Sequence, residues 1–308
     1  MIIGSKTGIL RHQIQNRYDL GFRHTEIQVF TENLKNPKEA KKILSEFDLD
    51  YYSFHMPHNS LRGRKIGLGN YSESQRNDVL DTFKRTIDIA ADNKEDAIIV
   101  LHVGEELTLA NNSIKNKNLK TYPQLFLEEI SILRDYVIEN KYKVKLGLEH
   151  VPPIAAWAGT FHYREWGSDW KYMDLIKMVG INDIVKAVLD LPHANYYIQF
   201  MNRRGHNYSY RDFLESFGDD LILVHMANPL GAEREFISSL KHHSWGFNPY
   251  KEEDISCIKN ILKLLKEYHF DGYMTVEVSL KNHDNGANMM KNKKLIEKIM
   301  EEEGYLNQ

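Results

Sequence analysis

VKAVLDLPH, residues 185–193, is an apolar run that ends in Asp190 and His193, two side chains able to bind a divalent metal. Such a run is typical of a strand whose two faces are both buried, so its polar tip lies where the strand leaves the core. A buried carboxylate is costly unless it is paired or bound to a metal. Five other runs have the same form, and each carries a histidine or a glutamate at its end: YYSFHMPH (51–58, His55), AIIVLHVG (97–104, His102), VKLGLEHVP (144–152, Glu149), LILVHMAN (221–228, His225) and YMTVEVS (273–279, Glu277).

Strand and helix patterns alternate along the 308 residues. The apolar spacing predicts eight strands, at 2–5, 24–30, 51–56, 97–103, 144–149, 185–191, 221–226 and 273–278. Helical spacing lies at 36–46, 74–93, 122–140, 174–179, 211–217, 253–268 and 292–303. The longest irregular stretches are expected after strands, at 105–121, 151–171, 196–210 and 228–248.

This alternation predicts an α/β fold, a single (β/α)8 TIM barrel that occupies residues 1–308 as one domain. The active site of such a barrel lies at the carboxyl ends of the strands, which is where every polar tip falls. A doubly wound sheet would gather its site at one switch point and would not explain ligands on six strands.

Charge and composition exclude several classes of protein. The net charge is −3 and charged residues make up 27%, which gives no sign of a strong overall field for nucleic acid or membrane. No stretch reaches the roughly 18 apolar residues of a membrane span, and the N-terminus does not resemble a signal peptide. A cytoplasmic location is therefore expected, and the single cysteine, Cys257, excludes an intrachain disulfide.

The ligand types indicate which metal the tips would bind. Carboxylates and imidazoles without thiolates suit Zn²⁺, Mn²⁺ or Co²⁺ rather than Ca²⁺. One four-ligand site is predicted from Glu149, Asp190, His225 and Glu277. A second site could be completed by His55, His102 and His242, while His193 could contact either the metal or the substrate.

Taken in order along the strands, these residues resemble the xylose isomerase-like superfamily of metal-dependent TIM barrels, which includes the endonuclease IV branch. The resemblance covers nearly the whole chain. EIQVFTENLK (26–35) is similar to the segment after the second strand of the endonuclease IV proteins. It implies that Glu149 bridges metals, that Asp190 and His193 form the Asp-x-x-His pair, and that His242 or His243 is the histidine of the loop after the seventh strand.

The chain also departs from the endonuclease pattern. His-Pro-Gly-Ser after the fourth strand is replaced by His102-Val103-Gly104-Glu105, and Glu-Asn-Thr-Ala-Gly after the fifth by Glu149-His150-Val151-Pro152-Pro153. The aspartate expected two residues before the loop histidine is Leu240 or Lys241, and the aromatic residue that enters DNA is replaced by His58. These changes weaken the case for a three-metal phosphodiesterase that acts on DNA.

Three functions remain open. The favoured one is a metal-dependent isomerase or epimerase of a small polyhydroxylated substrate, in which Glu149 and Glu277 transfer a proton as general acid and base. The alternatives are an endonuclease IV-like phosphodiesterase that cleaves abasic-site DNA, and a non-catalytic barrel that binds a metal or ligand. A small-molecule partner is thus favoured over nucleic acid, and no membrane partner is expected.

Four residues are candidates for substrate binding: His193, His243, Trp157 and Arg203. Trp157 belongs to an aromatic-rich loop that either packs upon itself or forms an apolar wall over the ligand. Arg203 is either a surface residue or a residue that binds a phosphate or carboxylate group of the substrate.

Overall fold

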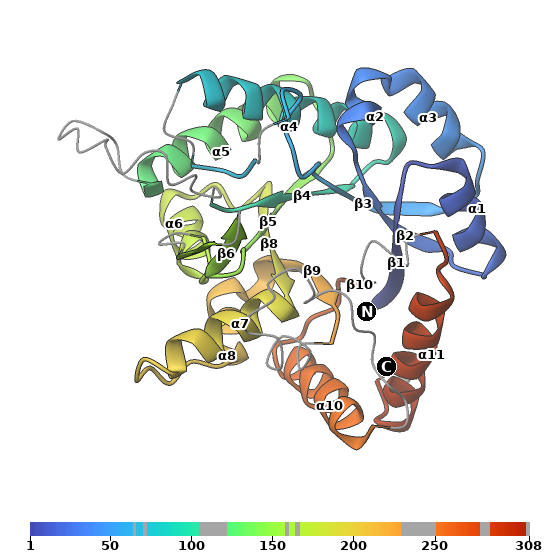
Figure 1. The fold of residues 1–308 in the computed structure, drawn as a ribbon, viewed down its shortest axis with the longest axis vertical. Coiled ribbons are helices and arrows are strands. Elements are labelled where there is room, and N and C mark those ends of the chain that lie inside the picture. Colours follow the sequence, from blue (N-terminus) through green and yellow to red (C-terminus); the bar gives the residue numbers. More distant parts are fainter. Residues whose placement is uncertain are drawn as a thin grey trace.

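The computed structural model describes residues 1–63, 66–69, 73–104, 122–157, 160–163, 167–228, 251–277 and 284–305. Eight parallel strands close into a barrel in the order β1-β10-β9-β8-β5-β4-β3-β2 (Figure 1). The predicted (β/α)8 barrel is therefore confirmed. Its strands are β1 (Ile2–Gly8), β2 (His24–Gln28), β3 (Asp50–His55), β4 (Ile98–His102), β5 (Lys145–Glu149), β8 (Val185–Asp190), β9 (Leu221–Met226) and β10 (Tyr273–Val276).

Helices surround the barrel on the outside (Figure 1). They are α1 (Arg11–Asp19), α2 (Thr31–Lys35), α3 (Pro37–Ser45), α4 (Glu73–Asn93), α5 (Tyr122–Glu139), α6 (Lys171–Val179), α7 (Leu191–Asn202), α8 (Tyr210–Phe217), α10 (Glu252–Glu267) and α11 (Ala287–Glu302), with a short 3-10 turn η2 (Gly218–Asp220). Among the described helices, none has the length and apolar character needed to cross a membrane.

Three segments differ from the sequence-based expectation. The expected irregular stretch at 196–210 is wrong in its first half, because α7 continues to Asn202. Residues 151–171 contain a small antiparallel hairpin of β6 (Ile154–Trp157) and β7 (Thr160–Tyr163). Helix α1 was not expected at all, since its sequence RHQIQNRYD is mostly polar and presents only a short buried face around Ile14. The apolar periodicity of such a segment is too weak to predict a helix from the sequence.

A bulge in β3 decides which of its side chains face the barrel interior. Asp50 pairs with His24 and Ser53 with Glu26, so three steps along β3 match two along β2. Because side chains alternate along a regular strand, Tyr52 and His55 would otherwise lie on opposite faces. The extra residue lets both point inward, Tyr52 into the apolar floor of the barrel and His55 toward its carboxyl end.

The floor of the barrel is apolar and tightly filled. Tyr52 packs with Ile98, Val188 and Leu223, and its ring stacks on Tyr273 at a centroid distance of 4.3 Å. This floor closes the amino-terminal end of the interior. The polar groups of the site lie above it, at the carboxyl ends of the strands.

Candidate metal centre

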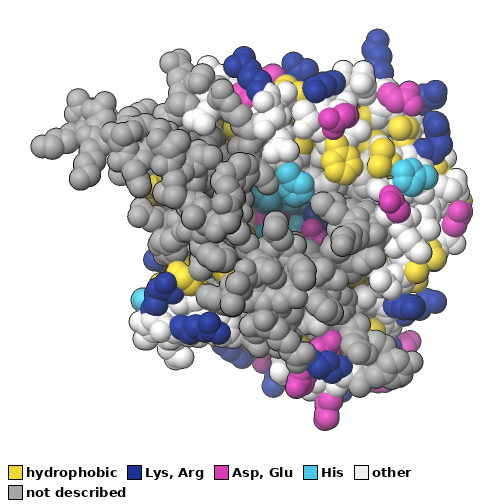
Figure 2. Space-filling view, viewed as in Figure 1, with side chains coloured by type: hydrophobic (Ala, Val, Ile, Leu, Met, Phe, Trp, Pro, Cys, Tyr) yellow, Lys and Arg dark blue, Asp and Glu magenta, His cyan; other side chains and the backbone are white. Residues whose placement is uncertain are grey.

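The polar tips of six strands meet at the carboxyl end of the barrel. Figure 2 shows histidine, acidic and basic side chains together in a hollow near the middle of this face. The six polar tips are His55 on β3, His102 on β4, Glu149 on β5, Asp190 on β8, His225 on β9 and Glu277, which directly follows β10. Residues distant in sequence converge here because parallel strands of a barrel all end at the same rim.

His225 lies at the centre of one half of the cluster. Its Nδ1 atom is 3.4 Å from Oε2 of Glu277, 3.5 Å from Oε2 of Glu149 and 3.8 Å from Oδ2 of Asp190. His225 and Asp190 are fully buried, and Glu149 nearly so. One imidazole nitrogen surrounded by three carboxylates is the donor set predicted for the four-ligand site.

Three atoms in this half of the cluster have unmet bonding capacity. Oε2 of Glu149, Oδ2 of Asp190 and Nδ1 of His225 are buried and make no hydrogen bond. One ligand atom from each of these residues lies within 4.8 Å of the other two. Buried polar atoms are normally satisfied, so each exception needs an explanation. Three converging exceptions of these types fit a divalent metal such as zinc or manganese.

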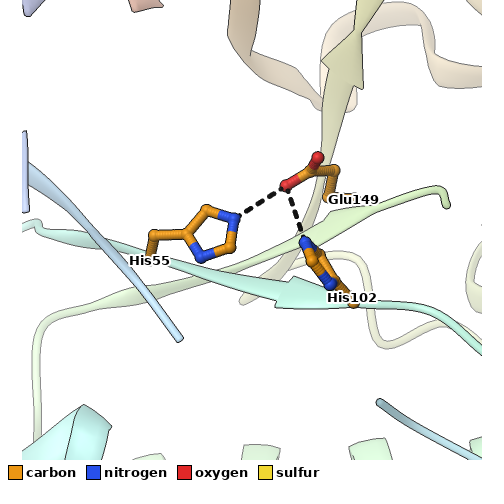
Figure 3. Close-up of side chains that lie close together, drawn as sticks. All are labelled: His55, His102 and Glu149. Atoms are coloured by element: carbon orange, nitrogen blue, oxygen red, sulfur yellow. Dashed lines mark ion pairs between the residues drawn. The ribbon is translucent and has the colours of Figure 1, made fainter. Parts of the chain in front are cut away.

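The other half of the cluster is built around the same carboxylate. Figure 3 shows the imidazoles of His55 and His102 directed at one oxygen of Glu149. Their Nε2 atoms are 3.3 Å and 3.5 Å from Oε2 of Glu149. These three residues also have ligand atoms within 4.8 Å of one another. Glu149 therefore belongs to both groups and lies where a bridging ligand would be.

Hydrogen bonds to the far side of two rings set their tautomers. Nδ1 of His55 lies 2.9 Å from the carbonyl oxygen of Met56, and a carbonyl only accepts. Nδ1 of His55 must therefore donate, which leaves Nε2 as the lone-pair nitrogen that faces Glu149. Nε2 of His225 lies 3.0 Å from Oε2 of Glu26 and donates to it, so the lone pair of His225 is on Nδ1. Such partners fix the orientation of metal-binding histidines.

The concentration of charge shifts the pKa values of the cluster. Burial alone lowers the pKa of His225, but Glu26, Glu149 and Glu277 raise it well above its usual value. Burial alone raises the pKa of Glu149, but His225 and His102 lower it well below its usual value. Burial lowers the pKa of His102 to about 4. The cluster therefore holds anionic carboxylates that require positive charge nearby.

Asp190 and His193 owe their positions to the start of α7. Asp190 caps this helix, and its Oδ1 accepts a hydrogen bond of 2.7 Å from the backbone N–H of His193. Pro192 occupies the first turn, where a missing N–H costs nothing. Nδ1 of His193 donates to the carbonyl of His150 at 2.9 Å, which orients the ring beside the cluster.

Two charged residues of the cluster were not identified from the sequence. Lys6 on β1 and Glu26 on β2 are buried inside the barrel, and Nζ of Lys6 lies 3.0 Å from Oε1 of Glu26. Lys6 also donates to Oε1 of Glu277 at 2.7 Å. Glu26 is a charged residue inside the strand expected at 24–30, which is the signal that would have identified it. Lys6 lies just past the strand expected at 2–5, since β1 continues to Gly8.

His150, which follows Glu149, belongs to the packed core. It is fully buried, and its ring packs 4.9 Å from the ring of Phe213. Burial lowers its pKa to about 3, so it is a neutral core histidine that supports the cluster through its backbone carbonyl. His58, in contrast, is exposed as expected.

The remaining predicted site residues are His242, His243, Trp157 and Arg203. His242, His243 and the side chain of Trp157 lie outside the described residues. Arg203 is exposed and follows the last turn of α7, so about 18 Å of helix separate it from Asp190.

Comparisons with known proteins agree with the fold. The family model for the xylose isomerase-like TIM barrel matches residues 15–299. The 3-keto-D-glucoside 4-epimerase YcjR from E. coli is 16% identical with a TM-score of 0.64, over 97% of this chain and 99% of that chain. An AP endonuclease of family 2 from Brucella melitensis is 14% identical with a TM-score of 0.59, over 93% and 96%. A D-allulose 3-epimerase from Methylomonas sp. is 14% identical with a TM-score of 0.56, over 98% and 96%.

At these identities the structural likeness shows the fold alone. A comparison with curated protein sequences found no match.

Proposed function

Because the chain belongs to the xylose isomerase-like TIM barrel family, we propose that it is a divalent-metal-dependent isomerase or epimerase of a small, sugar-like polyhydroxylated substrate. The observation that carries the proposal is the set of three carboxylates around Nδ1 of His225. Glu149, Asp190, His225 and Glu277 would hold one Zn²⁺, Mn²⁺ or Co²⁺ ion. When bound, such an ion polarises a substrate carbonyl as a Lewis acid.

The two glutamates supply the proton chemistry. Glu149 and Glu277 flank His225, at 3.5 Å and 3.4 Å from its Nδ1, so they approach a shared point from β5 and from β10. A carboxylate at each side can remove a C–H proton and return one as general base and acid. Lys6 donates to Oε1 of Glu277 and holds this carboxylate in place for the proton transfer.

Two structural neighbours act on sugars, namely the 3-keto-D-glucoside 4-epimerase and the D-allulose 3-epimerase. Both are barrels of the same architecture as this chain. They support the choice of a ketose or a related keto sugar as the first substrates to test.

The test combines metal analysis with proton exchange. Purified protein is freed of metal, reloaded with Zn²⁺, Mn²⁺ or Co²⁺, and incubated in deuterated water with a panel of ketoses and keto-glycosides. We expect at least one bound metal per chain and metal-dependent loss of a C–H proton signal in the NMR spectrum. A chain that binds none of these metals would overturn the proposal. Metal binding without any exchange across the panel would favour the non-catalytic barrel.

A second function is favoured by one specific observation. His55 and His102 converge on Oε2 of Glu149 (Figure 3), and a one-metal isomerase does not need them as ligands. Two metals sharing Glu149 would suit phosphodiester hydrolysis, since paired metals stabilise both the attacking and the leaving oxygen. One metal per chain favours the isomerase, and two or three favour the hydrolase.

A further inference from the structure

A buried ion pair lies directly beneath the candidate metal centre. Lys6 and Glu26 face one another in the register of β1 and β2, and their side chains are 2% and 0% exposed. Each residue contacts a different ligand residue of the candidate site, Lys6 at Glu277 and Glu26 at His225.

Each member of the pair holds a different ligand. Nζ of Lys6 donates to Oε1 of Glu277 at 2.7 Å, and Oε2 of Glu26 accepts from Nε2 of His225 at 3.0 Å. The ion pair lies on β1 and β2, and it contacts His225 on β9 and Glu277 directly after β10. The contact to His225 fixes its tautomer, and the contact to Glu277 leaves one carboxylate oxygen for a metal.

The carboxylate of Glu26 is itself held in place. Ser53 donates to its Oε2 at 2.7 Å and Thr275 at 3.4 Å, and Thr275 in turn bonds the hydroxyl of Tyr52 at 2.7 Å. Charged and hydrogen-bonded supports of this kind hold a side chain in one rotamer. The network therefore connects the rigid floor of the barrel to the ligands above it.

We propose that Lys6 and Glu26 are positioning residues that orient His225 and Glu277 for metal binding, an inference that rests on the proposed function. A structural role alone explains the arrangement poorly, because a buried ion pair can often be replaced by apolar residues at no cost in stability. The pair instead does what a packed apolar side chain cannot. It accepts a hydrogen bond from Nε2 of His225 and holds Oε1 of Glu277 with a charged donor.

The experiment measures metal affinity rather than turnover. Two variants are compared with the wild type: Glu26→Gln, which keeps an acceptor for His225 but removes the charge, and the double variant Lys6→Met/Glu26→Met, which removes both charges of the pair together. Mn²⁺ affinity is measured by calorimetry, and the Co²⁺ absorption spectrum reports ligand geometry. Loss of such outer contacts typically weakens metal binding by about 10–100-fold. We expect this loss in the double variant, with a changed Co²⁺ spectrum, and a smaller loss in Glu26→Gln.

Lys186→Met is the matched control. Lys186 pairs with Asp220 at 2.6 Å, is mostly buried, and lies on β8 away from the ligand atoms. Its loss is expected to change stability and leave the Mn²⁺ affinity within threefold of the wild type.

The outcomes separate this inference from the proposed function. A double variant that binds Mn²⁺ within threefold of the wild type, with an unchanged Co²⁺ spectrum, would overturn the positioning role and leave the metal-dependent function standing. A wild type that binds no metal would overturn both. If the double variant does not fold, Glu26→Gln decides the question, since an unchanged affinity and spectrum in that variant also contradict the role.

Discussion

Asp190 serves the backbone and the candidate site with different oxygens. Its Oδ1 caps α7 through the N–H of His193, while its buried Oδ2 makes no hydrogen bond and lies 3.8 Å from Nδ1 of His225. Burial raises the pKa of this carboxyl. Because the two oxygens make different contacts, a substitution can remove one role and keep the other.

We expect Asp190→Asn and Asp190→Ala to differ in stability but not in metal binding. Asparagine retains the capping oxygen, so its metal-free form should be as stable as the wild type. Alanine loses the cap and should cost about 1 kcal/mol of unfolding free energy. Both lose the anionic ligand and should lose the metal. Urea unfolding of the metal-free proteins and Mn²⁺ titration check this, and equal stability of the two variants would contradict the capping role.

Glu277→Gln should leave the fold intact and remove turnover. The amide oxygen can still accept from Lys6, but an amide cannot exchange the proton and is a weaker ligand. We expect kcat to fall by at least about 100-fold, measured by proton exchange on the substrate identified above. Circular dichroism serves as the control for folding. Activity within tenfold of the wild type would mean that Glu277 is not an acid or base.

At the scale of elements, the tips of the strands were predictable and the inward-facing charges were not. Apolar runs ending in a ligand type located His55, His102, Glu149, Asp190 and His225 at the rim, because a strand end is visible in the sequence. The bulge in β3 is not visible there, since strict alternation would place Tyr52 and His55 on opposite faces. The site residues that Lys6 and Glu26 contact, Glu277 and His225, are 271 and 199 residues away, a separation that local pattern cannot bridge.

Gly167 ties the ends of β4 and β5 together after the small hairpin. Its φ is +82°, and a Cβ atom would lie 2.3 Å from the carbonyl oxygen of Val103, next to His102. Its own carbonyl accepts from the N–H of Val151 at 2.8 Å. Substitution at Gly167 would therefore have to move the backbone that carries His102.

Gly180→Ala is the matched control for Gly167→Ala. Gly180 also has a left-handed φ, +70°, but an added Cβ would meet nothing within 4 Å. The left-handed conformation alone costs about 1–2 kcal/mol for alanine. We expect Gly167→Ala to lose at least twice as much unfolding free energy as Gly180→Ala in urea titrations. Equal losses would show that the contact with Val103 relaxes freely.

At the scale of the whole molecule, the order of strand and helix signals was enough to predict the closed barrel. A single unit, a strand followed by a helix, is repeated around the whole barrel. The substrate was not predictable, because it depends on loop residues such as His242 and His243 that no periodic pattern places. The single-domain organisation over residues 1–308 and the cytoplasmic location stay predictions.

Net charge also belongs to this scale, and it bears on DNA as a substrate. An enzyme that cleaves abasic-site DNA must bind the phosphate backbone, and its affinity should fall steeply with salt. The chain has a net charge of −3 and carries His58 where the endonuclease pattern has an aromatic residue. We expect no specific incision of an abasic-site duplex at physiological salt with Zn²⁺ or Mn²⁺, assayed beside an active AP endonuclease. Metal-dependent incision that Glu149→Ala abolishes would promote the hydrolase.

The pairing of β1 with β10 has a consequence for biosynthesis. Ile2 pairs with Tyr273, and Lys6 reaches Glu277, so the barrel closes between segments about 270 residues apart. While the chain is still on the ribosome and β10 is inside the exit tunnel, β1 and β9 both have open edges and Lys6 lacks one of its two carboxylates. Contacts at such separation are slow to form because loop closure opposes them. The candidate site is therefore complete only after translation has passed β10 and Glu277 can pair with Lys6.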